Sequence, residues 1–188
     1  HAAGEVASQL MVNHLEILDQ DPGKEDTEAL LAAAADDANE AISEHVTAHP
    51  ETEGMGTTLS TMLFNGTTFG VCHVGDSRAY LLRDGKLEQI TKDDTYVQSL
   101  VDKGELDPGD VSSHPQKSLI LKAYTGRPVE ATLFTLDAKP GDRILLCSDG
   151  LSDPVTASTI ETALGQGSIE QDGSTLVDLA IRSGGPDN

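Results

Sequence analysis

The sequence has few aromatic residues, few basic residues and no long apolar runs. Aromatic residues make up 3% of the 188 residues and tryptophan is absent, so the core must be built from Leu, Val, Ile and Ala. Twelve Lys and Arg stand against 32 Asp and Glu, giving a formal charge of −20. This balance argues against nucleic-acid binding through phosphate neutralisation. No segment approaches the ~20 consecutive apolar residues that a membrane-spanning helix needs, so we expect no membrane contact within this segment.

Cysteine is also scarce, and motifs for several enzyme classes are missing. Cys72 and Cys147 each lie in an apolar, strand-like run, which predicts two buried free thiols and no disulfide framework. Reduced thiols favour a cytoplasmic protein. No His or Cys pair has the spacing of a zinc site, and no G-x-S-x-G elbow or Walker loop is present. The chemistry must therefore come from other residues.

The length and the hydrophobic periodicity predict one α+β domain over residues 1–188. Two hairpins are indicated by an Asn-Gly pair at residues 65–66 and an Asp-Gly pair at residues 84–85, each between strand-like runs. Consecutive hairpins indicate antiparallel sheets. We expect helices at Gly4–Asp19, Thr27–Val46, Thr95–Lys103, Thr156–Leu164 and Ser174–Arg182, and strands at Thr57–Phe64, Thr68–Val74, Arg78–Arg83, Lys86–Ile90, Ala131–Thr135 and Arg143–Cys147. The segment Ser118–Tyr124 is apolar and ambiguous in type.

Three aspartates lie in glycine-containing turns far apart in the sequence: Asp76, Asp149 and Asp187. Asp76 and Asp149 each follow an apolar strand, so a sheet would carry both side chains at its rim. Carboxylates are the ligands that hard divalent cations prefer. Taken singly, each one is better explained as a turn aspartate that bonds its own backbone. Local sequence alone leaves both interpretations open.

Six ordered motifs decide between them. They are GMGTTL (54–59), HVGDSRAYL (73–81), ITKDDTYVQSLVDKG (90–104), SHPQKSLILKA (113–123), GDRILLCSDGLSD (141–153) and GGPDN (184–188). With these motifs the chain resembles the metal-dependent serine/threonine protein phosphatases, the PPM or type-2C family. It looks most similar to actinobacterial members that oppose membrane Ser/Thr kinases.

The resemblance implies a fold and a metal site. The fold is a four-layer α-β-β-α sandwich with two antiparallel sheets, here truncated at both ends, with the N-terminal strands and the final strand missing. The implied cofactors are two catalytic Mn²⁺ or Mg²⁺ ions and a third, weaker one. Asp149 and Asp187 match ligands of the two-metal centre, Asp76 matches a ligand of the third site, and Ser118 matches a further contributor to that site. Residues 95–113 match the flap beside the active site.

The resemblance also implies a mechanism whose remaining parts lie before residue 1. His1 matches the histidine proposed as general acid, while the phosphate-binding Arg, the bridging Asp and its neighbouring Gly would precede it. A metal-activated water would attack the phosphorus of phosphoserine or phosphothreonine in a protein. We expect phosphoproteins as substrates, cognate Ser/Thr kinases as partners, no nucleic acid, and a cytoplasmic monomer whose parent protein carries a membrane anchor beyond residue 188. The alternative is a non-catalytic regulatory or scaffold module with a phosphatase fold, which an isolated fragment without the bridging Asp would also fit.

Overall fold

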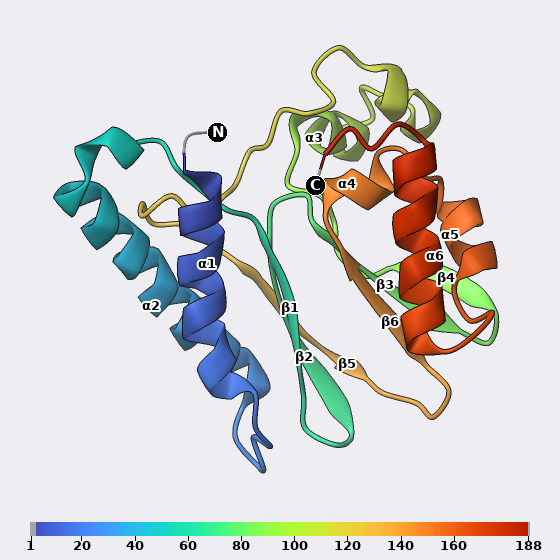
Figure 1. The fold of residues 1–188 in the computed structure, drawn as a ribbon, viewed down its shortest axis with the longest axis horizontal. Helices are drawn as coiled ribbons and strands as arrows, with labels where there is room; N and C mark the ends of the chain where they lie inside the picture. Colours follow the sequence, from blue (N-terminus) through green and yellow to red (C-terminus); the bar gives the residue numbers. More distant parts are fainter. Residues whose placement is uncertain (1–2, 188) are drawn as a thin grey trace. The chain divides into compact units, whose positions relative to one another are not determined.

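The computed structural model describes residues 3–187, and these fall into two compact units (Figure 1). Unit 1 comprises residues 1–75 and 120–138, and unit 2 comprises residues 76–119 and 139–188. Each unit contains one three-stranded antiparallel sheet together with its own helices. The predicted α+β class with two antiparallel sheets is therefore confirmed, whereas the single domain and the order of the four layers stay predictions.

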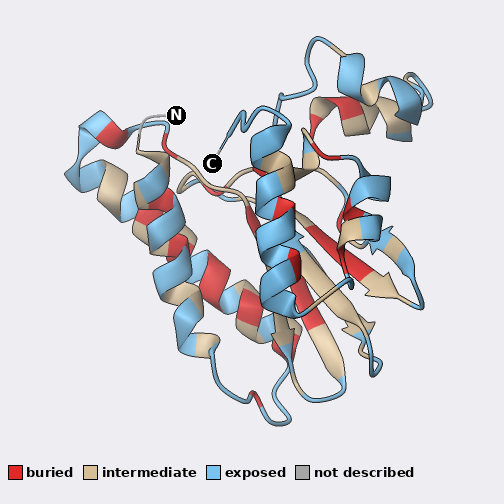
Figure 2. Ribbon diagram, turned by 45° about the vertical axis from the view of Figure 1, so that its right-hand side comes forward, coloured by how far each residue is buried: buried red, intermediate tan, exposed pale blue. Residues whose placement is uncertain are grey.

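Unit 1 packs two helices and a sheet around an apolar core. Its elements are α1 (Gly4–Leu15), η1 (Glu16–Leu18), α2 (Thr27–Ala48), η2 (Pro50–Thr52), β1 (Leu59–Phe64), β2 (Thr68–Val74) and β5 (Thr132–Asp137). The strand order is β1-β2-β5, and α2 packs against both α1 and β2. Figure 2 shows buried positions recurring along one side of α2, and these include the small residues Ala34, Ala35 and Ala38. Small side chains allow the helix to lie close to the sheet.

One contact shows how close α2 lies to β2. Gly70 is buried in β2, and a Cβ atom added there would lie 2.6 Å from Cβ and 3.0 Å from the carbonyl carbon of Thr27. Thr27 is the first residue of α2, whose N-cap Asp26 accepts hydrogen bonds from the backbone of Glu28 and Ala29. The lack of a side chain at Gly70 therefore lets the first turn of α2 rest on the strand.

Unit 2 also combines a three-stranded antiparallel sheet with helices, but most of its helices follow the strands in the chain. Its elements are β3 (Arg78–Arg83), β4 (Lys86–Gln89), α3 (Tyr96–Asp102), η3 (Pro108–Ser113), β6 (Arg143–Cys147), α4 (Asp149–Ser152), α5 (Ala157–Ala163) and α6 (Ile169–Arg182). The strand order is β4-β3-β6. The turn between β3 and β4 has positive φ at both Asp84 (53°) and Gly85 (76°), as a two-residue type I′ hairpin requires. Tyr80, Val155, Ile160, Leu164 and Leu176 form the buried core.

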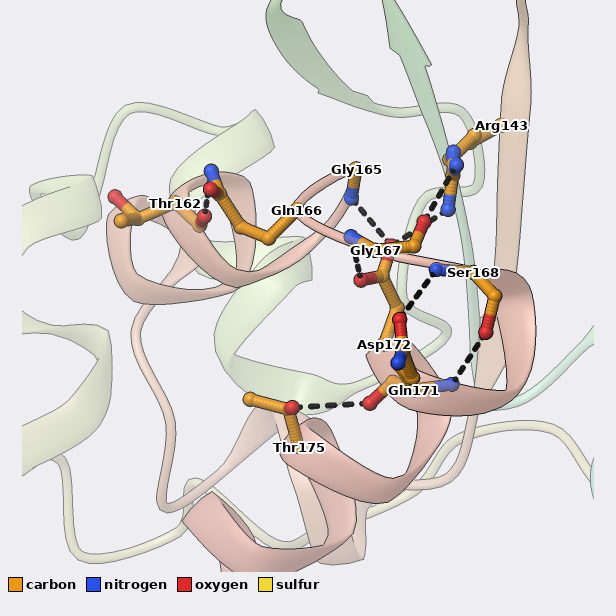
Figure 3. A network of polar contacts seen from close by, with 9 residues as sticks. All are labelled: Arg143, Thr162, Gly165, Gln166, Gly167, Ser168, Gln171, Asp172 and Thr175. Carbon is orange, nitrogen blue, oxygen red and sulfur yellow. Dashed lines mark hydrogen bonds and ion pairs between the residues drawn. The ribbon is translucent and has the colours of Figure 1, made fainter.

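A buried aspartate ties α6 to the start of β6 (Figure 3). Asp172 is 3% exposed and accepts hydrogen bonds from the backbone N–H groups of Gly165 and Gly167 and from the Arg143 guanidinium at 2.7 Å. Arg143 also donates to the Gly167 carbonyl at 2.8 Å. The first-named of these bonds, from Gly165, is the main reason that the pKa of Asp172 is lowered. The network holds the α5–α6 loop against the strand that leads to Asp149.

The same loop explains one wrong helix boundary. We expected the last helix to begin at Ser174, whereas α6 begins at Ile169. Ser168 is its N-cap and forms a capping box with Gln171, in which the Gln171 N–H donates to Ser168 Oγ (3.2 Å) and the Ser168 N–H donates to Gln171 Oε1 (2.9 Å). The Ser-x-x-Gln pattern predicts such a start, so the earlier boundary was readable in the sequence.

Other departures are smaller. The first helix ends at Leu15 and continues as a short 3₁₀ turn. The ambiguous segment 118–124 forms no strand, and has isolated bridge residues at Ile120 and at Tyr124, the latter paired with Thr57. Cys72 is buried as predicted, but Cys147 is only half-buried, because it packs beside the unit 2 core and not within it. None of the helices described is long and apolar enough to cross a membrane.

Candidate metal centre

The carboxylates singled out in the sequence lie together at one end of the unit 2 sheet. Asp76 precedes β3, Asp149 follows β6 as the first residue of α4, and the chain after α6 returns toward α4 (Figure 1). The returning segment brings Asp187 to Asp149, and their side chains share a hydrogen bond. Because β3 and β6 are antiparallel with Arg78 opposite Cys147, the start of one strand lies beside the end of the other. This register explains why Asp76 and Asp149 meet.

The crowding of carboxylates is visible in their acidity. The pKa of Asp149 is raised to about 6, first by burial and then by the negative charge of Asp76, the hydrogen bond that its protonated carboxyl donates to Asp187, and the charges of Asp153 and Asp187. The pKa of Asp76 is also raised, mainly by burial and then by the charges of Asp93 and Asp153. Partly buried like charges repel because neither water nor salt screens them fully. The protein thus maintains a cluster that is unfavourable unless cations or protons neutralise it.

Asp153 belongs to this cluster although we did not single it out from the sequence. It lies four residues after Asp149, at the C-cap of α4, and four residues is the spacing that places two side chains on one face of a helix. Burial raises its pKa, whereas the charges of Arg78 and Lys117 lower it. The signal that could have identified it was this spacing within the SDGLSD motif, but the short α4 helix was not predicted.

Two further candidates have different outcomes. Ser118 is exposed and follows Lys117, whose charge acts on Asp153, so the segment that contains Ser118 lies near the carboxylates. His1 lies outside the described residues, and its predicted role as general acid stays a prediction.

The donors of the cluster suit a hard divalent ion but do not complete its shell. All of them are oxygen atoms, which is the ligand type that Mg²⁺ and Mn²⁺ prefer, and a dication would remove the repulsion among the carboxylates. Within residues 3–187, no group of three or more His, Cys, Asp or Glu side chains is arranged so that it could hold a metal ion. The carboxylates therefore have the ligand chemistry of a metal centre, but within the described residues they do not have its arrangement.

Comparison with known proteins identifies the class. The family model described as "Protein phosphatase 2C" matches residues 1–170. The serine/threonine protein phosphatase PstP of Mycobacterium tuberculosis is 55% identical over 188 residues, a match that covers 100% of this chain and 37% of that protein. The serine/threonine phosphatase stp of Listeria monocytogenes is 32% identical over 198 residues, covering 100% and 77%. The chain thus spans about a third of the length of the first of these relatives.

Solved structures agree with this assignment. The crystal structure of the Mycobacterium tuberculosis phosphatase PstP/Ppp superimposes with a TM-score of 0.97 at 54% identity, covering 100% of this chain and 80% of that chain. The PstP catalytic domain in complex with two manganese ions gives a TM-score of 0.93 at 52% identity, covering 100% and 79%. The chain belongs to the protein phosphatase 2C family, as the six motifs predicted.

Proposed function

We propose that the chain forms the core of a metal-dependent phosphatase that hydrolyses phosphoserine and phosphothreonine in proteins. The observation that carries this proposal is the cluster of Asp76, Asp149 and Asp187 at one end of the unit 2 sheet, in a chain of this family. The two relatives and the two solved structures described above bear the name serine/threonine phosphatase, and one of the structures holds two manganese ions.

The proposed roles of the residues are those that the resemblance to the family implies. Asp149 and Asp187 hold the catalytic Mn²⁺ or Mg²⁺ ions, and Asp76 with Ser118 holds an accessory ion. Bound divalent ions lower the pKa of water and neutralise charge that develops on a transferred phosphoryl group. A serine or threonine oxygen is a poor leaving group and needs a proton, which His1 supplies in this proposal. No side chain needs to form a covalent intermediate.

The remaining expectations rest on the family alone. Phosphoproteins are the proposed substrates and cognate Ser/Thr kinases the proposed functional partners. A cytoplasmic location and a monomeric state also stay predictions.

The experiment that tests this function measures phosphate release from a phosphothreonine peptide by the full-length protein. We expect turnover with Mn²⁺ and none after the metal has been removed with a chelator. If p-nitrophenyl phosphate and the phosphopeptide both remain uncleaved at saturating Mn²⁺, the enzyme assignment is wrong and the scaffold alternative is favoured.

A further inference from the structure

The Arg78 side chain makes more hydrogen bonds than its position at the start of a strand requires. It is the first residue of β3, two residues after Asp76. Its Nε donates to Asp93 Oδ1 at 2.9 Å, one terminal nitrogen donates to Asp93 Oδ2 at 2.6 Å, and the other donates to the Tyr80 hydroxyl at 2.9 Å. The side chains of Arg78 and Asp93 are 23% and 13% exposed. A two-pronged pair of this kind fixes orientation as well as distance.

Asp93 lies where the chain leaves the sheet to form a long excursion, which we define as residues 95–119. The excursion contains α3 and η3, and its two ends are joined because the Tyr96 N–H donates to the Leu119 carbonyl at 2.9 Å. Thr95 caps α3 by accepting from the Gln98 N–H. The base of the excursion is therefore a closed ring, and Asp93 is its attachment to β3.

The returning end of this excursion carries Ser118. Ser118 precedes Leu119, the residue bonded to Tyr96, and follows Lys117, whose charge acts on Asp153 together with that of Arg78. Two sets of hydrogen bonds and the short backbone stretch between them thus connect Arg78 through Asp93 and Tyr96 to Leu119, the neighbour of Ser118. Displacement of any link in this path would move Ser118 relative to Asp76.

We propose that Arg78 and Asp93 are positioning residues, which fix the base of the excursion so that Ser118 and Asp76 contribute to one accessory cation site. The proposal rests on the proposed function for the identity of that site, and it assigns neither residue a contact with the substrate. It predicts that loosening the pair weakens the accessory ion without removing the ligands themselves.

The chain offers a matched control on the same strand. Arg83, at the far end of β3, makes an equivalent pair with Asp142, in which Nε donates to Oδ1 at 2.8 Å and a terminal nitrogen donates to Oδ2 at 2.7 Å. The exposures are 25% and 7%. Asp142 anchors the β5–β6 turn and not the excursion. The pairs thus have similar bonding and similar exposure, but only one is attached to residues 95–119.

The experiment compares Arg78→Lys with Arg83→Lys in the full-length protein. Lysine keeps the positive charge but cannot make the two-pronged contact. We expect both variants to lose similar thermal stability. Only Arg78→Lys should speed amide hydrogen exchange across residues 96–119 and weaken the weakest Mn²⁺ equivalent, by about tenfold, as seen when residues that orient metal ligands are changed. Binding is followed by electron paramagnetic resonance of free Mn²⁺.

Kinetics separate this role from a merely structural one. Arg78→Lys should raise the Mn²⁺ concentration needed for half-maximal activity while the KM for the phosphopeptide stays unchanged. Asp93→Asn is the second variant, and it should reproduce the effect if Arg78→Lys does not fold. Equal Mn²⁺ affinity and equal exchange in the Arg78 and Arg83 variants would overturn the proposal. A wild-type protein that binds Mn²⁺ but releases no phosphate would instead overturn the proposed function, and the exchange and binding measurements would still decide the positioning role.

Discussion

Replacing Asp149 with Asn should stabilise the metal-free protein while destroying its response to metal. The pKa of Asp149 lies at about 6 in the folded chain, against an ordinary value of 3.8, so the folded state resists its ionisation. A rise of about two in the pKa corresponds to about 3 kcal/mol. Because this carboxylate is partly exposed to solvent, screening reduces that figure to about 1.5 kcal/mol.

The sign of the effect sets its pH dependence. A carboxyl whose folded pKa is raised contributes stability that is fully present below about pH 4 and is lost as the pH rises through about 6. Above that pH the wild-type protein carries the full penalty and Asp149→Asn does not. The variant should therefore be more stable than wild type by about 1.5 kcal/mol near pH 7.5 in a chelator, and this gain should vanish near pH 4.

Urea unfolding of the full-length protein, in a chelator and again in Mn²⁺, measures both effects. Added Mn²⁺ should stabilise wild type by binding the folded state but should hardly change Asp149→Asn, which should also lose Mn²⁺-dependent turnover. Asp178→Asn, an exposed change on α6, controls for the loss of one negative charge. A variant that is less stable than wild type without metal, or that keeps the wild-type response to Mn²⁺, would refute the reasoning.

Three other predictions concern unit 1 and the accessory site. Gly70→Ala should destabilise the protein by about 1–3 kcal/mol, because the added Cβ would overlap Thr27. The control Gly173→Ala lies in α6, where an added Cβ meets nothing within 4 Å, and it should stabilise the protein by about 0.5–1 kcal/mol. A change of the same sign for both variants in thermal denaturation would contradict this prediction. Asp76→Asn should weaken activity and Mn²⁺ response without unfolding the domain, so unchanged kinetics with an unchanged metal titration would count against its role. Cys72, whose pKa burial raises, should resist iodoacetamide until the protein unfolds, and rapid alkylation of the native protein would show that β2 is more open than described.

Local sequence signals predicted most of the fold because the decisive residues act locally. The Asp84-Gly85 turn needs two positive φ values that few residue pairs adopt, and the hairpin it predicted is present with both. The predicted C-terminus of α2 lies within two residues of the observed one, because a long apolar stripe restricts where the helix can end. The missed start of α6 reflects a capping box that was present in the sequence and not used.

The site was harder to predict from the sequence, because whether the aspartates lie close together depends on the register of the strands. Nothing local to Asp76 or Asp149 shows that Arg78 pairs opposite Cys147, and it is this register that brings the two carboxylates together. The resemblance to a family supplied their association before the structure did. Asp153 was missed because its position depends on α4, a helix of four residues that is too short to leave a periodic pattern.

The most direct test of the central claim is the position of bound manganese in the full-length protein. Crystals grown with Mn²⁺ and measured at a wavelength sensitive to manganese give anomalous difference density at each ion. We expect density within coordination distance of the carboxylates of Asp149 and Asp187. Saturating Mn²⁺ with no density beside these two residues would contradict it.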